Sequence, residues 1–368
     1  MATVHPDPRC AGTVIVGMSG GVDSAVAALL LLQQGYSVQG LFMSNWEDDD
    51  GYCTTAGDFQ DARRVCEKLR IPLHRVSFAA EYRQRVFAHF LDEYAAGRTP
   101  NPDVLCNREI KFGVCLEYLQ RLGGSWIATG HYARLEASPT GPLLLKAVDS
   151  AKDQSYFLHS VVPSALAKTL FPIGEIRKEE VRRLAHAAGL PVFDKPDSTG
   201  ICFIGERPFQ QFLSRFLQHK PGPIETDQGQ IIGEHQGLHL YTYGQRSGLG
   251  VGGRVGAAAK PWYVADKNAA RNALIVVQEQ DHPLLLSKSF DVESASWAAA
   301  APQVGVEFAC TVKTRYRQAD LACQVRLQPA SGVRVTLREP ARAVTPGQYA
   351  VFYEGERCLG GGVISNRL

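Results

Sequence analysis

The sequence contains no hydrophobic run long enough to cross a membrane, because charged residues or glycine interrupt every apolar stretch before about 18 residues. The opening residues, MATVHPDPRC, lack the basic and then apolar segments of a secretory signal. The nine cysteines form no CxxC pair and no cluster with histidine at zinc-binding spacing, and their odd number argues against a disulfide scaffold. We therefore expect a cytoplasmic protein without a membrane partner.

The composition is that of an ordinary globular protein. Its 368 residues are 45% hydrophobic, which is enough for two or three domains with buried cores. The formal net charge of +2 neither requires nor excludes nucleic acid. Residues 301–368, however, hold nine Lys or Arg against five acidic residues. This basic C-terminal segment fits a polyanionic partner, and it fits equally well a solvated basic face.

Short apolar runs alternate with amphipathic segments through the first part of the chain. The expected strands are 13–18, 37–43, 72–78 and 125–130. The expected helices are one from Val22 that Gly35 closes, followed by 57–70, 81–97 and 108–123. Strands that alternate with helices build βαβ units. The predicted fold class is therefore α/β, with a parallel sheet covered by helices on both faces.

The pattern changes from about residue 220, where glycine and proline become frequent and short β-rich runs replace the helices. Beyond about residue 288 the runs are spaced like the strands of a small barrel or sandwich. We therefore predict three domains: a catalytic domain over 1–215, a small, mostly β central domain over 216–287 and a C-terminal β domain over 288–368.

The segment VIVGMSGGVDS, residues 14–24, places a glycine pair between an expected strand and an expected helix. Such a turn offers unpaired backbone N–H groups and the positive end of a helix dipole, so it suits an anion such as phosphate. A plain tight turn is the alternative. The Walker pattern would need lysine where Asp23 stands, and the glycines do not have Rossmann spacing. An acidic residue so close to phosphate suggests a ligand of Mg²⁺.

The SGGVDS part of this segment resembles the pyrophosphate-binding loop of the ATP-pyrophosphatase superfamily. Members of that superfamily cleave ATP between its α and β phosphates to adenylate a substrate. The resemblance covers the first domain only, and it does not separate tRNA thiolases from amidotransferases or argininosuccinate synthetase.

Two cysteines lie in polar, loop-like stretches. Cys106, in TPNPDVLCNREIKF, is expected at a helix start, with Asn107 as a plausible cap and Asp103 as a candidate proton acceptor. A helix N-terminus favours the thiolate, whereas the charge of Asp103 opposes it. Cys202 lies in PDSTGICFIG. The pair suits thiol exchange or persulfide chemistry, and a static disulfide is the competing interpretation.

Together with NPDVLCNREIKF, the motifs GHYAR, KDQSYFL, DSTGICFI and YTYGQRSGLGVGG make the chain resemble the tRNA-specific 2-thiouridylases of the MnmA/TrmU family, from about residue 12 to the C-terminus. The resemblance implies an adenine nucleotide alpha hydrolase-like first domain and a C-terminal β-barrel. It also implies that the C2 oxygen of the wobble uridine is adenylated by ATP with Mg²⁺ and then replaced by sulfur from a cysteine persulfide. The implied partners are the tRNA anticodon loop and a persulfide donor protein, such as a cysteine desulfurase or a sulfur-relay protein.

The same resemblance assigns roles to individual residues. ATP would be bound by Gly17, Met18, Ser19, Gly20, Gly21, Val22, Asp23, Ser24, Met43 and Gly130. The target base would face Asn101, Pro102 and Asp103. Cys106 would be the nucleophile and Cys202 the persulfide carrier, and a disulfide between them would end the cycle. The tRNA would contact His131, Lys152, Asp153, Gln154, Arg315, Tyr316 and Gln348.

Three alternatives stay open on the sequence alone. The run KTRYRQ, residues 313–318, mixes cations with one stackable ring, but by itself it is more typical of an exposed barrel strand than of an RNA contact. The enzyme could be an amidotransferase, although ammonia chemistry needs neither Cys106 nor Cys202. The chain could also be a tRNA-binding protein that keeps the loop for structure only. The other seven cysteines are expected to be structural.

Overall fold

The computed structural model describes residues 7, 12–46, 55–197, 209–251, 260–298, 302–329 and 332–368. Cys10, Cys53 and Cys202 lie outside these residues, so the predictions made for them are not addressed by the fold. Within the described ranges, no helix is long and apolar enough to cross a membrane.

The first domain is built on a parallel five-stranded sheet, as predicted. Its strand order is β3-β2-β1-β4-β7, and every neighbouring pair is parallel. The strands are β1 (Thr13–Gly17), β2 (Ser37–Ser44), β3 (Leu73–Ser77), β4 (Gly124–Ala128) and β7 (Thr169–Leu170).

Helices cover both faces of this sheet, because alternate strand residues point to opposite sides. Val14 and Val16 pack in one cluster with α1 (Val22–Gln33), α2 (Thr55–Leu69) and α9 (Lys178–Ala187). Ile15 packs in a second cluster with the helices of the other face. Those helices are α3 (Ala79–Tyr82), η1 (Arg83–Phe87), α4 (Ala88–Ala95), α5 (Pro102–Leu105), η2 (Cys106–Val114) and α6 (Cys115–Arg121). The predicted α/β class with helices on both faces is confirmed.

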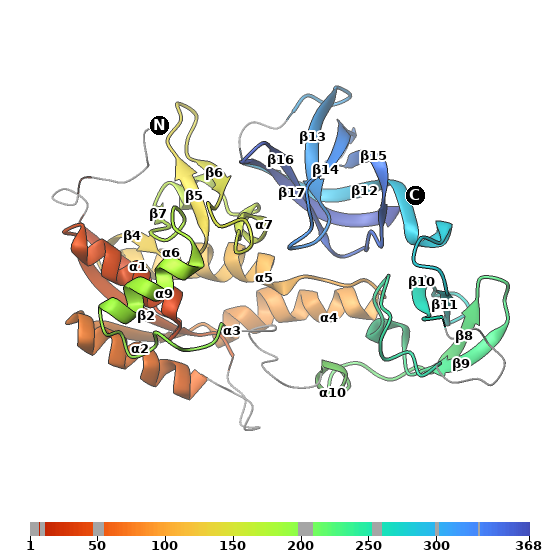
Figure 1. Ribbon diagram of the computed structural model, residues 1–368, viewed down its shortest axis with the longest axis horizontal. Coiled ribbons are helices and arrows are strands. Elements are labelled where there is room, and N and C mark those ends of the chain that lie inside the picture. Colours follow the sequence, from red (N-terminus) through yellow and green to blue (C-terminus); the bar gives the residue numbers. More distant parts are fainter. Residues whose placement is uncertain are drawn as a thin grey trace.

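The central domain is a four-stranded sheet in the order β10-β11-β8-β9. Its strands are β8 (Gly222–Thr226), β9 (Ile231–His235), β10 (Tyr263–Asn268) and β11 (Ala273–Val277). Three short helices accompany these segments, namely α10 (Phe209–Leu213), η3 (Leu238–Leu240) and η4 (Pro283–Leu285). In Figure 1 this domain lies below the barrel, at the far end of α4 from the parallel sheet.

The C-terminal domain is a closed barrel of six antiparallel strands, so the barrel alternative is confirmed over the sandwich. The order is β12-β15-β14-β13-β16-β17, and β17 pairs back with β12. The strands are β12 (Leu286–Trp297), β13 (Glu307–Lys313), β14 (Leu321–Leu327), β15 (Val333–Arg342), β16 (Tyr349–Glu354) and β17 (Arg357–Arg367).

A hairpin from the first domain extends the barrel sheet. It consists of β5 (Ala133–Glu136) and β6 (Leu143–Lys146), and β6 pairs with β17 through Leu145 and Arg357. Arg134 Nη2 donates to Glu356 Oε2 across the same boundary at 2.6 Å. Two short helices, α7 (Ser155–Leu158) and α8 (Pro163–Leu166), follow this hairpin, and α7 lies between the sheet domain and the barrel in Figure 1. The first and third domains are thus joined by strand pairing as well as by side chains.

Candidate active site

The loop between β1 and α1 is held in shape by its own serines. Ser24 Oγ accepts a hydrogen bond from Ser19 N at 3.2 Å and donates one to Gly21 O at 3.1 Å. Ser19 Oγ accepts from Gly21 N at 3.3 Å. Gly21 is the N-cap of α1 and provides no side-chain acceptor, so the first N–H groups of this helix receive no cap from it. The loop therefore presents amide donors at a helix N-terminus, which is the arrangement expected for phosphate.

One glycine of the loop has no possible substitute. Gly20 has φ +75°, which favours glycine, and a Cβ atom built on it would lie 2.3 Å from the carbonyl oxygen of Asp58 in α2. Gly20 is thus required by the close approach of α2 as well as by the turn.

Met43 and Gly130, which the resemblance assigns to ATP, both lie beside the loop. A Cβ atom on Gly130 would be 2.7 Å from the backbone of Asp23 and Ser24. The Met43 Cε atom lies 3.5 Å from the position of a Cβ on Gly17. The residues expected to hold ATP therefore gather around the start of α1, although their contact with nucleotide stays a prediction.

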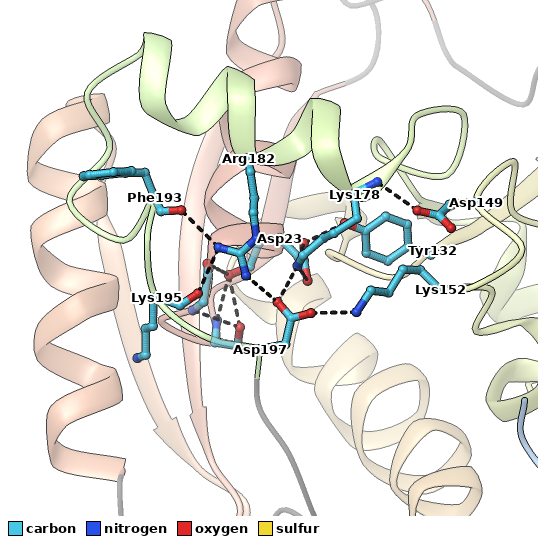
Figure 2. A network of polar contacts seen from close by, with 12 residues as sticks. Asp23, Tyr132, Asp149, Lys152, Lys178, Arg182, Phe193, Lys195 and Asp197 are labelled. Carbon is cyan, nitrogen blue, oxygen red and sulfur yellow. Dashed lines mark hydrogen bonds and ion pairs between the residues drawn. The ribbon is translucent and has the colours of Figure 1, made fainter.

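Lys178, the first residue of α9, supplies a cation to this loop (Figure 2). Its Nζ atom lies 2.7 Å and 2.8 Å from the two carboxylate oxygens of Asp23. Tyr132 Oη donates to the same carboxylate at 2.8 Å. Lys178 thus contacts both oxygens of Asp23, and Oδ1 also accepts from Tyr132, so a metal ion at Asp23 would share the carboxylate with Lys178.

A second lysine contacts the outer side of the loop. Lys195 Nζ donates to Gly20 O at 3.1 Å and pairs with Asp58 and Asp61 of α2 at 2.8 Å and 2.5 Å. Two lysines that lie more than 150 residues beyond the loop in sequence thus surround a motif that contains none.

Asp197 connects the same network to the segment that precedes Cys202. Its carboxylate accepts from Lys152 Nζ at 2.6 Å and from Arg182 Nη2 at 3.0 Å, and it pairs with Lys178 Nζ at 2.8 Å (Figure 2). Burial alone would raise the pKa of Asp197, but the hydrogen bonds and charges of Lys152 and Lys178 lower it to about 2. Cys202 itself lies outside the described residues.

We expect the stability that Asp197 contributes to depend on pH in a defined direction. Its folded pKa is lower than the unfolded value of about 3.9, so its contribution is complete above about pH 4 and is lost as the pH falls toward 2. Asp197→Asn should cost about 1 kcal/mol at neutral pH, because a third of the side chain is exposed and solvent screens its ion pairs. Thermal unfolding of both proteins across this pH range should show the difference shrinking with acid, and a constant difference would contradict the assignment.

Cys106 lies one turn inside its helix, which corrects one sequence expectation. The cap is Asn101, whose Oδ1 accepts from Asp103 N at 3.2 Å, with Pro102 in the first helical position. Asn107, predicted as the cap, is a buried helix residue whose Nδ2 donates to Phe157 O at 3.2 Å. The proline after Asn101 starts the helix earlier than the cysteine pattern suggested, and the helix continues from Cys106 as π-helix η2.

Cys106 lies next to the end of β2, the strand that pairs with β1. Its side chain is 2% exposed, and Asn45 Nδ2, two residues beyond Met43, lies 4.0 Å from its Sγ atom. Asp103 is half-buried, and burial raises the pKa of its carboxyl. Asp103 stands three residues before Cys106, so the two side chains share one side of the helix.

The side-chain amide oxygens (Oδ1) of Asn45 and Asn107 lack hydrogen-bond partners among the described residues. Both are buried, and neither accepts a hydrogen bond from any part of the chain that the structure describes. Buried acceptors of this kind are costly unless a ligand supplies the donor.

The predicted tRNA residues of the first domain are mostly engaged within the protein. The ring of His131 is buried between Phe112 and Phe171, and burial lowers its pKa well below the ordinary value. Asp153 is buried and accepts from Ala147 N and Ser155 N at 3.1 Å and 3.2 Å.

The two neighbours of Asp153 are more accessible. Gln154 Oε1 accepts from Tyr132 N at 3.0 Å, whereas Lys152 is partly exposed and pairs with Asp197. Within this group only Lys152 offers a cation to RNA, and the tRNA contacts of all four residues, His131 included, stay predictions.

The KTRYRQ run is a turn rather than an exposed strand. β13 ends at Lys313, and the next residues form the connection to β14, in which Arg317 has φ +63°. This turn brings the Tyr316 ring to 4.4 Å from the Phe157 ring, and the carbonyl of Phe157 accepts from Asn107 beside Cys106. The tertiary fold therefore places the barrel turn close to the helix that carries Cys106.

The other two predicted tRNA residues of the barrel are held by backbone carbonyls. Arg315 Nη2 donates to Arg342 O at 2.9 Å, and Gln348 Nε2 donates to Thr99 O at 2.8 Å. Their contacts with RNA are not tested by the structure.

The remaining described cysteines have the buried character expected of structural residues. Burial raises the pKa of Cys66 to about 11 and those of Cys115 and Cys358 to about 12. Cys310 and Cys323 face each other across β13 and β14, with their sulfur atoms 3.6 Å apart.

Sequence reasoning missed most residues of the network in Figure 2, among them Lys178, Arg182, Lys195 and Asp197. Asp197 could have been found, because it lies in the PDSTGICFIG stretch beside Cys202. The lysines carry no local signal, since a lysine at a helix start, such as Lys178, or at the end of a turn, such as Lys195, is usually solvated. Among the residues that the structure describes, no three His, Cys, Asp or Glu side chains form a metal-binding cluster.

Comparison with protein families gives three successive matches. Residues 12–206 match the model described as "tRNA methyl transferase HUP domain", and residues 210–278 match its "PRC-barrel domain". Residues 287–364 match the "Aminomethyltransferase beta-barrel domain".

Curated relatives match almost the whole chain. A tRNA-specific 2-thiouridylase MnmA of Chromohalobacter salexigens is 57% identical over 353 residues, which cover 95% of this chain and 92% of the relative. The protein of that name from Vibrio cholerae is 54% identical over 373 residues, with complete coverage of both chains. The one from Bordetella pertussis is 57% identical and covers 97% of this chain and 99% of its own.

Solved structures give a weaker likeness. The U34-tRNA thiolase NcsA from Methanococcus maripaludis is 20% identical, with a TM-score of 0.34 over 55% of this chain and 63% of that chain. A score this low supports no argument about function.

Proposed function

The chain belongs to the family of tRNA-specific 2-thiouridylases and is therefore a tRNA sulfurtransferase, and from this premise we propose that it uses ATP to replace the C2 oxygen of the anticodon wobble uridine with sulfur. The observation that best supports this chemistry is the position of Cys106 at the same end of the sheet as the phosphate loop. Asn45 follows strand β2, which pairs with β1 of the loop, and it lies 4.0 Å from Cys106 Sγ. An activated base and a sulfur nucleophile could therefore meet within one site.

In the first step, the C2 oxygen of the uridine attacks the α-phosphorus of ATP, and pyrophosphate leaves. The amides at the start of α1 would bind the departing phosphates, and Lys178 would balance their charge. Asp23 would hold Mg²⁺, which binds through one or two carboxylates plus phosphates. The ion would stabilise negative charge on the leaving group. Adenylation turns a poor leaving group, a carbonyl oxygen, into AMP.

In the second step, the terminal sulfur of a Cys202 persulfide forms the new bond to C2, and AMP leaves. Cys106 as thiolate then attacks Cys202 Sγ, which breaks the S–S bond to the base and forms a Cys106–Cys202 disulfide. Alternatively, Cys106 attacks first and releases hydrosulfide, which then attacks C2. Both orders consume one ATP and one persulfide and require a thiol reductant, and in both Asp103 would accept the Cys106 proton.

The bound base would be recognised close to Cys106. Uracil presents an N3–H donor, and the buried Asn45 carbonyl is an acceptor without a partner among the described residues. The uridine must leave its stack to reach this depth, which is usual for enzymes that modify a base. The barrel turn with Arg315 and Tyr316 would then contact the anticodon arm from the outside.

The test is incubation with unmodified tRNA, Mg-ATP, a persulfide donor and a thiol reductant, followed by mass analysis of the nucleosides. We expect 2-thiouridine at the wobble position, pyrophosphate release that requires tRNA, and AMP in equal amount. Methylated uridine, which the names of two matching family models suggest, would have a different mass, and an amidated base would indicate ammonia chemistry. A protein that only binds tRNA would release no pyrophosphate.

A further inference from the structure

The short connection between α4 and α5 is held by both of the other domains. Thr99 N donates to Pro346 O at 3.0 Å, and Thr99 O accepts from Gln348 Nε2 at 2.8 Å. The barrel loop between β15 and β16 therefore engages both backbone polar groups of this one residue. Thr99 is 9% exposed, so these bonds are shielded from water and are strong for their kind.

The central domain holds the same connection from another side. Lys267 Nζ, at the end of the β10 strand, donates to Gly97 O at 2.8 Å. Thr242 Oγ1 lies 3.3 Å from Thr99 Oγ1, at hydrogen-bonding distance. The segment 97–99, called here the junction, thus has direct hydrogen bonds to all three domains of the molecule.

The barrel loop is rigid where it meets the junction. Gly347 N donates to Ile364 O, and Ile364 N donates to Gln348 O, both at 2.8 Å, which ties the loop to β17. Gly347 has φ +92°, and a Cβ atom on it would lie 2.7 Å from Thr99 N. The backbones of Gly347 and Thr99 are therefore in van der Waals contact, with no room for a side chain between them.

The junction leads directly into the catalytic helix. Asn101, two residues after Thr99, caps the helix that carries Asp103 and Cys106. A rigid helix transmits a shift of its cap to every residue of its first turns, and misplacement by about 1 Å can cost about 100-fold in rate.

We propose that the junction is a positioning element, through which the barrel and the central domain set the place of Asp103 and Cys106 relative to the phosphate loop. The barrel, which is predicted to contact tRNA, would thereby help to determine whether the helix that carries Cys106 is correctly placed. This inference rests on the proposed function, since it assigns the junction a role in the same reaction.

Gly347→Ala tests the proposal. At saturating tRNA and ATP, we expect single-turnover sulfur transfer to fall about 100-fold, because the new methyl group displaces Thr99. The affinity for tRNA should stay within about threefold, since no charge is removed. The matched control is Gly305→Ala, also in the barrel, where φ is +82° but no atom lies within 4 Å of the added methyl group.

A second readout separates positioning from loss of fold. The rate at which iodoacetamide alkylates Cys106, located by peptide mass, should change in Gly347→Ala and not in Gly305→Ala, and both variants should remain folded at the assay temperature in a thermal melt. Equal sulfur transfer by the two variants would overturn the proposal. So would a loss of tRNA affinity in proportion to the loss of rate.

Lys267→Met provides an independent route if Gly347→Ala fails to fold. It removes the hydrogen bond to Gly97 O from the central domain, and we expect a reduction in rate of about 10-fold with tRNA affinity retained. Lys260→Met, at an exposed ion pair of the same domain, is its control. Absence of thiolation by the unmodified protein would reject the proposed function. An active unmodified protein whose Lys267→Met variant transfers sulfur at the same rate would reject only the positioning role of the junction.

Discussion

Cys106→Ser is expected to abolish sulfur transfer to tRNA, with a loss on the order of 10⁴-fold, because a serine hydroxyl can neither cleave a persulfide nor form a disulfide. Binding of tRNA should be nearly unchanged, since the side chain is 2% exposed and the replacement has almost the same shape. Sulfur transfer is measured as 2-thiouridine formed per enzyme in a single turnover, and binding by titration with labelled tRNA.

The matched control for this result is Cys115→Ala. Cys115 lies on the same side of the sheet, at the start of α6, and burial raises the pKa of its thiol to about 12. Its loss should lower stability slightly and leave sulfur transfer intact. Cys202→Ser should match Cys106→Ser in activity. Thiolation that survives either serine variant would remove that cysteine from the mechanism.

Lys178→Met is expected to reduce adenylation by about 10³-fold, because it removes the cation that the phosphate loop does not contain in its own sequence. The side chain is 10% exposed, and without it Asp23 would repel the triphosphate and Asp197 would lose one of its three basic partners. Release of pyrophosphate in the presence of tRNA measures this step directly. Asp23→Ala should also fail to release pyrophosphate, through loss of the proposed metal ligand.

Two further variants make this result specific. Arg183 lies on the same helix, but its side chain is 67% exposed and pairs with Glu180 at the surface, so Arg183→Met should leave pyrophosphate release unaffected. Lys178→Arg keeps the charge and should recover part of the activity. Normal pyrophosphate release by Lys178→Met would show that the lysine serves only to hold Asp23 and Asp197.

The predictable part of the fold consists of features that neighbouring residues specify. The run of Val14, Ile15 and Val16 before two glycines predicts a buried strand and an anion-binding turn, because strand burial and turn geometry depend on adjacent residues. The alternation of strands and helices predicts the parallel sheet, since a right-handed crossover leaves few other arrangements. The C-terminal spacing of short strands gave two options, and the pairing of β12 with β17 decides for the barrel.

The cap of the helix that carries Cys106 shows where the prediction from neighbouring residues was wrong. Asn107 has the right residue type, but Asn101 is followed by proline, which cannot donate a hydrogen bond and is favoured in the first helical position. Pro102 was therefore a sequence signal for the earlier helix start, which the prediction from the cysteine pattern overlooked. The prediction of an exposed strand over KTRYRQ was wrong for a different reason. Strand β13 ends at the first residue of this run, Lys313, and turns of this length have no strict sequence pattern.

The sequence by itself therefore determined the turn between β1 and α1, the class of the first domain and the candidate cysteine at position 106, because each depends on residues that are close together in the chain. Only the tertiary structure decided which cation faces Asp23, which strand β6 joins and which backbone groups hold Thr99. These contacts join residues more than 150 positions apart, and no local propensity or periodicity constrains such pairs. They depend on how the three domains pack. In that packing, the free energy gained by burying many side chains outweighs the local conformational preference of any single residue.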